Sequence, residues 1–215
     1  RAFKVTMDWR DYRQDSDPKQ DFAIFQKCRE WLPDDCPLSY DANCGYSVPT
    51  AIEQGRRFEE LGIAHFEEPL PQYDFPGLRQ VVDALDCAVS TGEQEISSWR
   101  FRDLIQIGNP DILQPDIHWV GGLTACLKIC RMAATAGLEV CLHGGGRDPY
   151  GQHLTWAMPN TPWGEYYIGS DPGIPLTIVS EPGAALPRNS YLESPPTAPG
   201  FGLGIEEEWL TPFSS

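Results

Sequence analysis

Short apolar runs alternate along the chain with longer stretches in which apolar residues recur at helical spacing. Apart from a first, longer step, the runs begin every 23–27 residues, and each has the length of a strand. This alternation is typical of a repeated strand–turn–helix unit. The predicted strands lie at 2–7, 37–41, 64–67, 87–91, 111–115, 138–142 and 164–168.

The clearest helix is predicted at 121–136. Its apolar face recurs at i, i+3, i+4 and i+7, in Leu123, Cys126, Leu127 and Cys130. Residues 50–61 and 74–85 show weaker versions of the same pattern. Ser97 with Ser98 is predicted to cap the helix that follows them.

Strands that alternate with helices favour parallel βαβ units, and seven strands at a steady period favour a barrel over an open sheet. A doubly wound sheet is the alternative. No dinucleotide-binding loop follows any strand, since Gly144-Gly145-Gly146 lacks the GxGxxG spacing.

Pro and Gly become dense after residue 170, so the tail is expected to run over the surface. The chain opens in mid-strand without a methionine, and we therefore expect it to be truncated.

The composition narrows the classes of partner. A formal net charge of −15 over 215 residues excludes nucleic acid and anionic membrane surfaces, because phosphate binding requires clustered Lys and Arg. No run of apolar residues approaches a membrane span, and no signal peptide is visible. The seven cysteines are scattered singly and odd in number, which indicates free thiols in a reducing cytoplasm.

Three carboxylates follow three successive predicted strands. Asp41, Glu67 and Glu93 are separated by 26 residues each time, and the carboxyl ends of barrel strands form the catalytic rim. Any one of these acids alone would be read as a helix cap or a solvated loop residue. Three in phase predict a site for a hard divalent cation such as Mg²⁺.

The next strand ends carry a different pair. Asp116 closes one strand and His143 the next, so the carboxylate can orient the imidazole for acid–base work. The last predicted strand ends at Glu165, another acid at the rim. His118 follows Asp116 by two residues and is a candidate to line the pocket. The two remaining histidines are interpreted as structural, His65 in the barrel wall and His153 in a helix.

The motifs occur in the order found in the mandelate racemase branch of the enolase superfamily, which the chain resembles. Within that branch the segment 114–124 is most similar to acid-sugar dehydratases of the L-rhamnonate type. The residues that carry the resemblance are Asp41-Ala42-Asn43, Phe66-Glu67-Glu68-Pro69, Gly92-Glu93, Pro115-Asp116 with Gly121-Gly122, His143, and Pro199-Gly200-Phe201-Gly202-Leu203-Gly204.

The resemblance implies an α/β fold, the C-terminal part of a modified (β/α)₇β TIM-type barrel. The N-terminal capping domain and the first barrel strand are expected to be absent. Residues 1–170 would form the partial barrel domain. Residues 171–215 would form a C-terminal return segment that packs on the barrel and the capping domain.

The resemblance also implies residue roles. Asp41, Glu67 and Glu93 would bind Mg²⁺, while Asp116 and His143 would form an acid–base dyad. The further catalytic or substrate-contacting positions would be Glu165, Lys4 (on the strand where the family carries a catalytic lysine motif), Asn43, Gln94 and His118.

Two positions qualify the substrate. Trp119 stands where lactonising and dipeptide-epimerising members have a lysine, which disfavours those reactions. Gln94 stands where rhamnonate-type enzymes have a histidine directly after the third metal ligand, and an amide is not a general acid. A substrate other than L-rhamnonate is therefore expected.

The predicted function is a Mg²⁺-dependent aldonate dehydratase that yields a 2-keto-3-deoxy acid from a small sugar-acid substrate. One alternative is a racemase or epimerase of a 2-hydroxy acid that uses the same enolate. A second is a non-catalytic truncated barrel. We further expect a cytoplasmic homo-oligomer.

Overall fold

The computed structural model describes residues 2–7, 13–168, 171, 173–195, 197–206, 208 and 210. Within these ranges strands and helices alternate from the first element to α6. The elements in chain order are β1 (Phe3–Thr6), α1 (Pro18–Trp31), β2 (Leu38–Asp41), α2 (Val48–Glu60), β3 (Ile63–Glu67), α3 (Phe75–Ala84), β4 (Ala88–Thr91), α4 (Ser97–Asp103), the π-helical turn η1 (Leu104–Gly108), β5 (Ile112–Leu113), α5 (Gly122–Ala136), β6 (Glu139–Val140), α6 (Pro149–Ala157) and α7 (Leu176–Val179).

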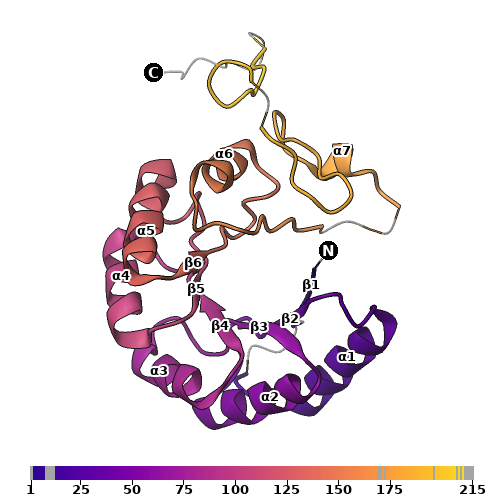
Figure 1. The fold of residues 1–215 in the computed structure, drawn as a ribbon, viewed down its shortest axis with the longest axis vertical. Helices are drawn as coiled ribbons and strands as arrows, with labels where there is room; N and C mark the ends of the chain where they lie inside the picture. Colours follow the sequence, from indigo (N-terminus) through magenta and orange to yellow (C-terminus); the bar gives the residue numbers. More distant parts are fainter. Residues whose placement is uncertain are drawn as a thin grey trace.

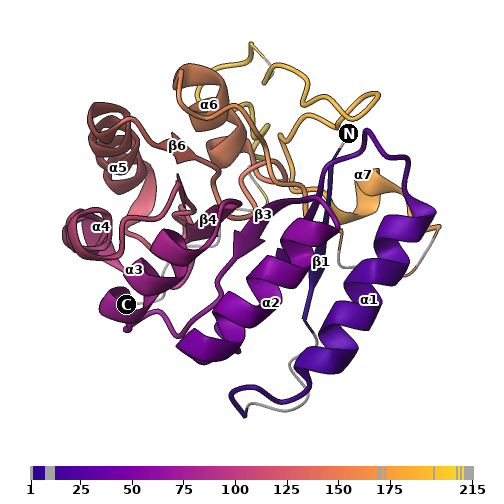
Figure 2. The same ribbon diagram turned by 60° about the horizontal axis from the view of Figure 1, so that its bottom comes forward.

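The six strands form one parallel sheet in the order β1-β2-β3-β4-β5-β6. Helices α1 to α6 form an outer arc around these strands (Figure 1), and α1 and α2 lie side by side on the outside of the sheet (Figure 2). A doubly wound sheet would carry helices on both faces. The arrangement therefore favours a barrel wall, in which each strand is followed by a helix on the outside.

The strand register aligns the carboxyl ends of neighbouring strands. Thr6 pairs with Asp41, and Asp41 pairs with Glu67. The last residue of β4, Thr91, pairs with Leu113 at the end of β5. Side chains that follow these ends consequently lie along a single edge of the sheet.

Six of the seven predicted strands are confirmed, whereas the strand predicted at 164–168 is wrong. That segment runs past β6 without forming a ladder. Isolated backbone bonds replace a ladder: Val140 N donates to Asn160 O at 2.8 Å, and Gly146 N donates to Glu165 O at 2.7 Å. Pro162, which has no N–H, lies between these two contacts and interrupts any continuous pairing.

The predicted helices at 121–136, 50–61 and 74–85 are confirmed as α5, α2 and α3. The predicted capping role of the serine pair before α4 is wrong. Ile96 occupies the N-cap position, and no side-chain hydrogen bond caps the helix. Ser97 is instead the first helical residue, with its N–H donated to the carbonyl of Val120 at 3.2 Å.

An aromatic cluster joins the first two helices to the sheet. Phe58 of α2 lies 4.8 Å from Phe25 of α1, 4.7 Å from Tyr40 of β2 and 5.6 Å from Phe66 of β3, measured between ring centroids. All four rings are at most 1% exposed. Their burial fixes α1 and α2 on the outside of β2 and β3 and so positions the strand ends.

Replacing Phe58 by Ala is expected to lower the free energy of unfolding by about 3–5 kcal/mol, because it removes a ring that closes this cluster and leaves a cavity. Urea unfolding followed by circular dichroism measures the change. The control is Trp31→Ala, at a side chain that is 74% exposed, and it should shift stability by no more than about 0.5 kcal/mol. Equal effects of the two substitutions would contradict the packing described.

The Pro- and Gly-rich tail beyond residue 170 is mostly exposed where it is described, as predicted. Gln152 of α6 ties it down, because its amide nitrogen donates to the carbonyl of Ala185 at 2.7 Å and its amide oxygen accepts from the N–H of Ala185 at 2.8 Å. The ring of Phe201 stands edge-on against Tyr150, with centroids 4.7 Å apart. The domain boundary at 170/171 stays a prediction.

None of the seven cysteines forms a disulfide, as expected from their number and scatter. In the part of the chain that the structure describes, no helix combines the length and apolar character needed to cross a bilayer.

Candidate active site

The three predicted metal-ligating acids lie at neighbouring strand ends. Asp41 ends β2 and Glu67 ends β3, and they are 4% and 0% exposed; Glu93 follows β4. Burial and the charge of Glu67 raise the pKa of Asp41 well above its usual range. Burial also raises the pKa of Glu93, again with a contribution from Glu67. The negative charges of these acids therefore act on one another, and a nearby positive charge would stabilise them.

Lys4 supplies the positive charge in this structure. Its ammonium contacts Glu67 Oε1, lies 2.5 Å from Glu165 Oε1, and is 3.9 Å from Asp41 Oδ2. Burial lowers the pKa of Lys4, but these three carboxylates raise it more strongly, above its ordinary value. Burial likewise raises the pKa of Glu67, but Lys4 and His65 bring it down to about 2.

Over the described ranges, no three His, Cys, Asp or Glu side chains are arranged ready to hold a metal ion. The ammonium of Lys4 lies among the carboxylates of Asp41, Glu67 and Glu165. The donor set itself fits Mg²⁺, because carboxylate oxygens that gather at the ends of three neighbouring strands are hard ligands. The pKa values of Asp41 and Glu93 stay raised even with Lys4 present, so a further positive charge nearby would stabilise their ionised forms.

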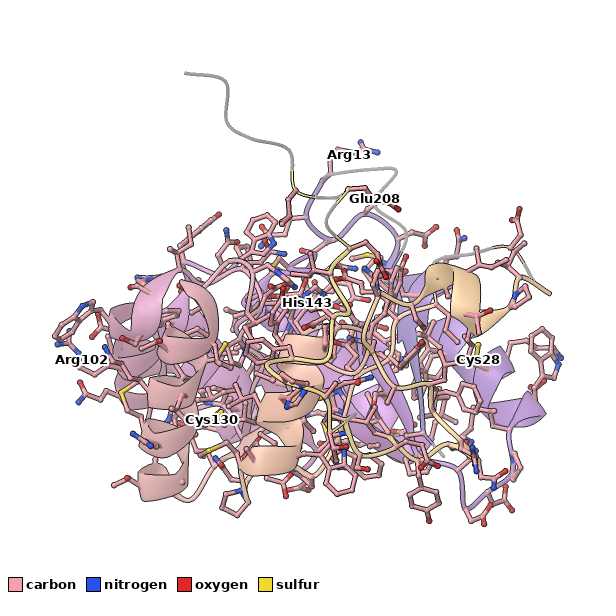
Figure 3. All side chains as sticks on the ribbon, turned by 90° about the horizontal axis from the view of Figure 1, so that it is seen from above. Arg13, Cys28, Arg102, Cys130, His143 and Glu208 are labelled. Atoms are coloured by element: carbon pink, nitrogen blue, oxygen red, sulfur yellow. The ribbon has the colours of Figure 1, made fainter. Side chains whose placement is uncertain are left out.

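The two residues of the predicted dyad are in contact. His143 Nδ1 lies 2.7 Å from Asp116 Oδ2, while the other carboxylate oxygen of Asp116 accepts from the backbone N–H of His118 at 2.7 Å. His143 Nε2 lies 3.5 Å from Glu93 Oε2, so the dyad borders the acid cluster. His143 is near the middle of the molecule, with Arg102 and Cys28 toward opposite sides (Figure 3).

His143 and Asp116 shift each other's pKa. Burial lowers the pKa of His143, but the hydrogen bond to Asp116 and the charges of Glu93 and Glu165 raise it to about 9. Burial raises the pKa of Asp116, but the hydrogen bonds from His143 and from the His118 backbone lower it below its usual value. The pair therefore favours an imidazolium oriented by a carboxylate.

Glu165 connects the two sides of the site. One carboxylate oxygen contacts Lys4 on β1, and the other accepts from the backbone N–H of Gly144 at 2.8 Å. Although the segment is not a strand, Glu165 thus lies at the rim, where the sequence placed it.

The three predicted substrate-binding residues lie at different distances from the acids. Asn43 donates its backbone N–H to Asp41 Oδ1 at 2.8 Å, and its buried side-chain nitrogen has no hydrogen-bond partner among the residues that the structure describes. The Gln94 amide nitrogen donates to Glu93 Oε1 at 3.2 Å. The His118 ring lies beside the N-terminus of α6, with its Nε2 3.9 Å from Oδ2 of the N-cap residue Asp148.

Residues that the sequence interpretation did not select surround Glu67. The Gln114 amide nitrogen donates to Glu67 Oε2 at 2.6 Å, and His65 Nε2 lies 3.3 Å from the same oxygen. The neighbouring Glu68 is fully buried; one of its oxygens accepts from the Cys44 thiol at 3.3 Å, and the other has no partner within the described part of the chain. For His65 a signal existed, since a residue two before Glu67 points to the same face of a strand.

The sequence profile of the family described as "Enolase C-terminal domain-like" matches residues 1–209. L-talarate/galactarate dehydratase from Salmonella typhimurium is 36% identical to the chain over 154 residues, which are 71% of the chain and 38% of that protein.

Solved structures give the same picture. The crystal structure of L-rhamnonate dehydratase from Gibberella zeae matches with a TM-score of 0.67 at 34% identity, over 71% of the chain and 39% of that protein. The crystal structure of L-talarate dehydratase from a Polaromonas species, complexed with Mg and L-glucarate, matches with a TM-score of 0.68 at 34% identity, over 76% of the chain and 44% of that protein. The chain spans less than half the length of these relatives.

Proposed function

The chain belongs to the enolase superfamily, in the family of enolase C-terminal domain-like proteins, and from this premise we propose that the full protein is a Mg²⁺-dependent dehydratase of acid sugars. The observation that carries the proposal is the hydrogen-bonded pair of His143 and Asp116, placed 3.5 Å from Glu93 in the acid cluster. Its relatives include dehydratases of talarate, galactarate and L-rhamnonate.

Asp41, Glu67 and Glu93 are the residues that would hold Mg²⁺. When bound, the cation would supply positive charge beside the substrate carboxylate, which makes the proton on the adjacent carbon removable. The contact of the Lys4 ammonium with Glu67, and its approach to within 3.9 Å of Asp41, support a cation site at these acids.

The proton transfers fall to His143 and Lys4. Removal of the α-proton breaks the C–H bond, and loss of the β-hydroxyl as water breaks the C–O bond once that oxygen is protonated. The resulting enol rearranges to a 2-keto-3-deoxy acid. We propose that His143 serves one of these transfers, with Asp116 orienting its ring, and that Lys4 serves the other.

Asn43 and Gln94 are proposed to bind the substrate. The amide nitrogen of Asn43 is a buried donor beside Asp41 that no described residue satisfies, and such a donor favours a polar ligand. Gln94 is held against Glu93 and offers an amide that can bind a hydroxyl but cannot protonate one.

With full-length protein and Mg²⁺, we expect a five- or six-carbon aldonate other than L-rhamnonate to give a keto acid. The measurement is semicarbazide detection of keto products across a panel of aldonates and aldarates. Reactions with chelator serve as the control. Strong activity on L-rhamnonate would remove the meaning assigned to Gln94. Exchange at the α-carbon without a keto product would instead favour the racemase or epimerase alternative.

A further inference from the structure

We propose that His65 is a positioning residue that orients the carboxylate of Glu67 for cation binding, through a hydrogen-bonded chain that continues to Ser39. The inference rests on the proposed function, because it concerns one of the three acids that would hold Mg²⁺. From the sequence alone, His65 was interpreted as a structural residue of the barrel wall.

The two oxygens of Glu67 have different partners. Oε2 accepts from the Gln114 amide at 2.6 Å and faces His65 Nε2 at 3.3 Å. Oε1 contacts the ammonium of Lys4. Side chains on β3 and directly after β5 therefore occupy one oxygen, and the other contacts a cationic group.

The chemistry of the partners fixes the tautomer of the neutral ring. An ionised carboxylate only accepts hydrogen bonds, so the Nε2 that faces Glu67 must carry the hydrogen. His65 Nδ1 is then an acceptor, and it lies 2.8 Å from the hydroxyl oxygen of Ser39. The chain thus runs from the Ser39 hydroxyl to Nδ1, and from Nε2–H to Glu67.

A serine, a histidine and an acid in hydrogen-bonded order also suggest a nucleophilic triad, but this alternative fails on access. Ser39 is 3% exposed on β2 and Glu67 is fully buried, so no substrate reaches the hydroxyl. A hydrogen-bonded chain with buried ends and a half-buried histidine between them has the character of the outer-shell contacts that fix metal ligands in place.

The burial of Glu67 makes its hydrogen bonds decisive for the orientation of its carboxylate. Glu67 is fully buried, so the orientation of its carboxylate depends on His65 of β3, on Gln114 directly after β5 and on Lys4. If Mg²⁺ displaces Lys4 from Oε1, only His65 and Gln114 continue to hold Oε2. Removing His65 would then leave one donor to resist rotation of the carboxylate.

The test measures Mg²⁺ affinity by calorimetry on the full-length protein. Replacing His65 by Leu is expected to weaken Mg²⁺ binding by about 10–100-fold, as found for outer-shell contacts. His65→Gln keeps an amide donor toward Glu67 and should recover affinity to within about threefold of the unchanged protein. The control is His153→Leu, at a ring that packs on Phe201, and it should leave Mg²⁺ affinity unchanged.

A second measurement needs no metal. Nitrogen-15 NMR of the metal-free protein should show His65 as the Nε2–H tautomer, and this readout decides the matter if His65→Leu does not fold. An Nδ1–H tautomer overturns the proposal, as does a folded His65→Leu variant that binds Mg²⁺ normally. In both cases the proposed function stands if the unchanged protein binds Mg²⁺. Absence of Mg²⁺ binding by the unchanged protein overturns the proposed function and this inference together.

Discussion

Replacement of His143 by Asn is expected to reduce turnover by about 10²–10⁴-fold, the range typical of a lost general acid or base. Asn can keep a hydrogen bond to Asp116 but cannot exchange a proton near neutral pH. The kcat for keto-acid formation on the best substrate measures the loss. The effect should lie in kcat, because His143 is proposed to act on the reacting bonds and not to hold the cation.

Mg²⁺ affinity provides the matched readout for the same variant. We expect it to change little, since the three acids remain, although the imidazole 3.5 Å from Glu93 is lost. His153→Asn, at a histidine of α6, is the control for replacing a ring elsewhere. Near-normal turnover by His143→Asn on the true substrate would exclude the dyad assignment.

Replacement of Asp41 by Asn is expected to weaken Mg²⁺ binding by about 10²-fold or more, because the affinity of oxygen sites depends strongly on the number of charged ligands. Turnover should fall with it. Calorimetry of the full-length protein gives the affinity. Asp34→Asn, at an exposed acid in the loop before β2, is the control for removing a negative charge.

The same substitution separates a lost ligand from a damaged fold. Without metal, Asp41→Asn should not lower thermal stability, because it removes one of several buried carboxylates that repel one another. With saturating Mg²⁺, the unchanged protein gains stability, by about 2.7 kcal/mol at a hundredfold excess over Kd, and the variant should lose this gain. A variant destabilised equally with and without Mg²⁺ would indicate a structural role for Asp41 instead.

Much of the rim could be predicted from the sequence because parallel strands of equal spacing align their ends. The 26-residue steps between Asp41, Glu67 and Glu93 reflect repeated strand–helix units of nearly constant length. The pairing of Asp41 with Glu67 turns this spacing into proximity. The contact between His143 and Asp116 follows in the same way from neighbouring strand ends.

The rest depends on which atoms meet after the sheet has formed. The link between Ser39, His65 and Glu67 joins β2 to β3, and only the register between these strands brings the three side chains together. The strand predicted at 164–168 does not form, for a different reason. Its composition resembles that of a strand, but Pro162, just before it, has no N–H and interrupts continuous pairing with β6.

The contact of Glu165 with both Lys4 and Gly144 has a consequence for the order in which the parts of the site assemble during synthesis. Lys4 leaves the ribosome near the start of this stretch and Glu165 only after α6. Contacts between residues so distant in sequence form late, since closing the loop costs entropy first. The nascent β1–α5 portion therefore carries its acids before their full set of partners exists, and the site is completed only after the segment that holds Glu165 has been made.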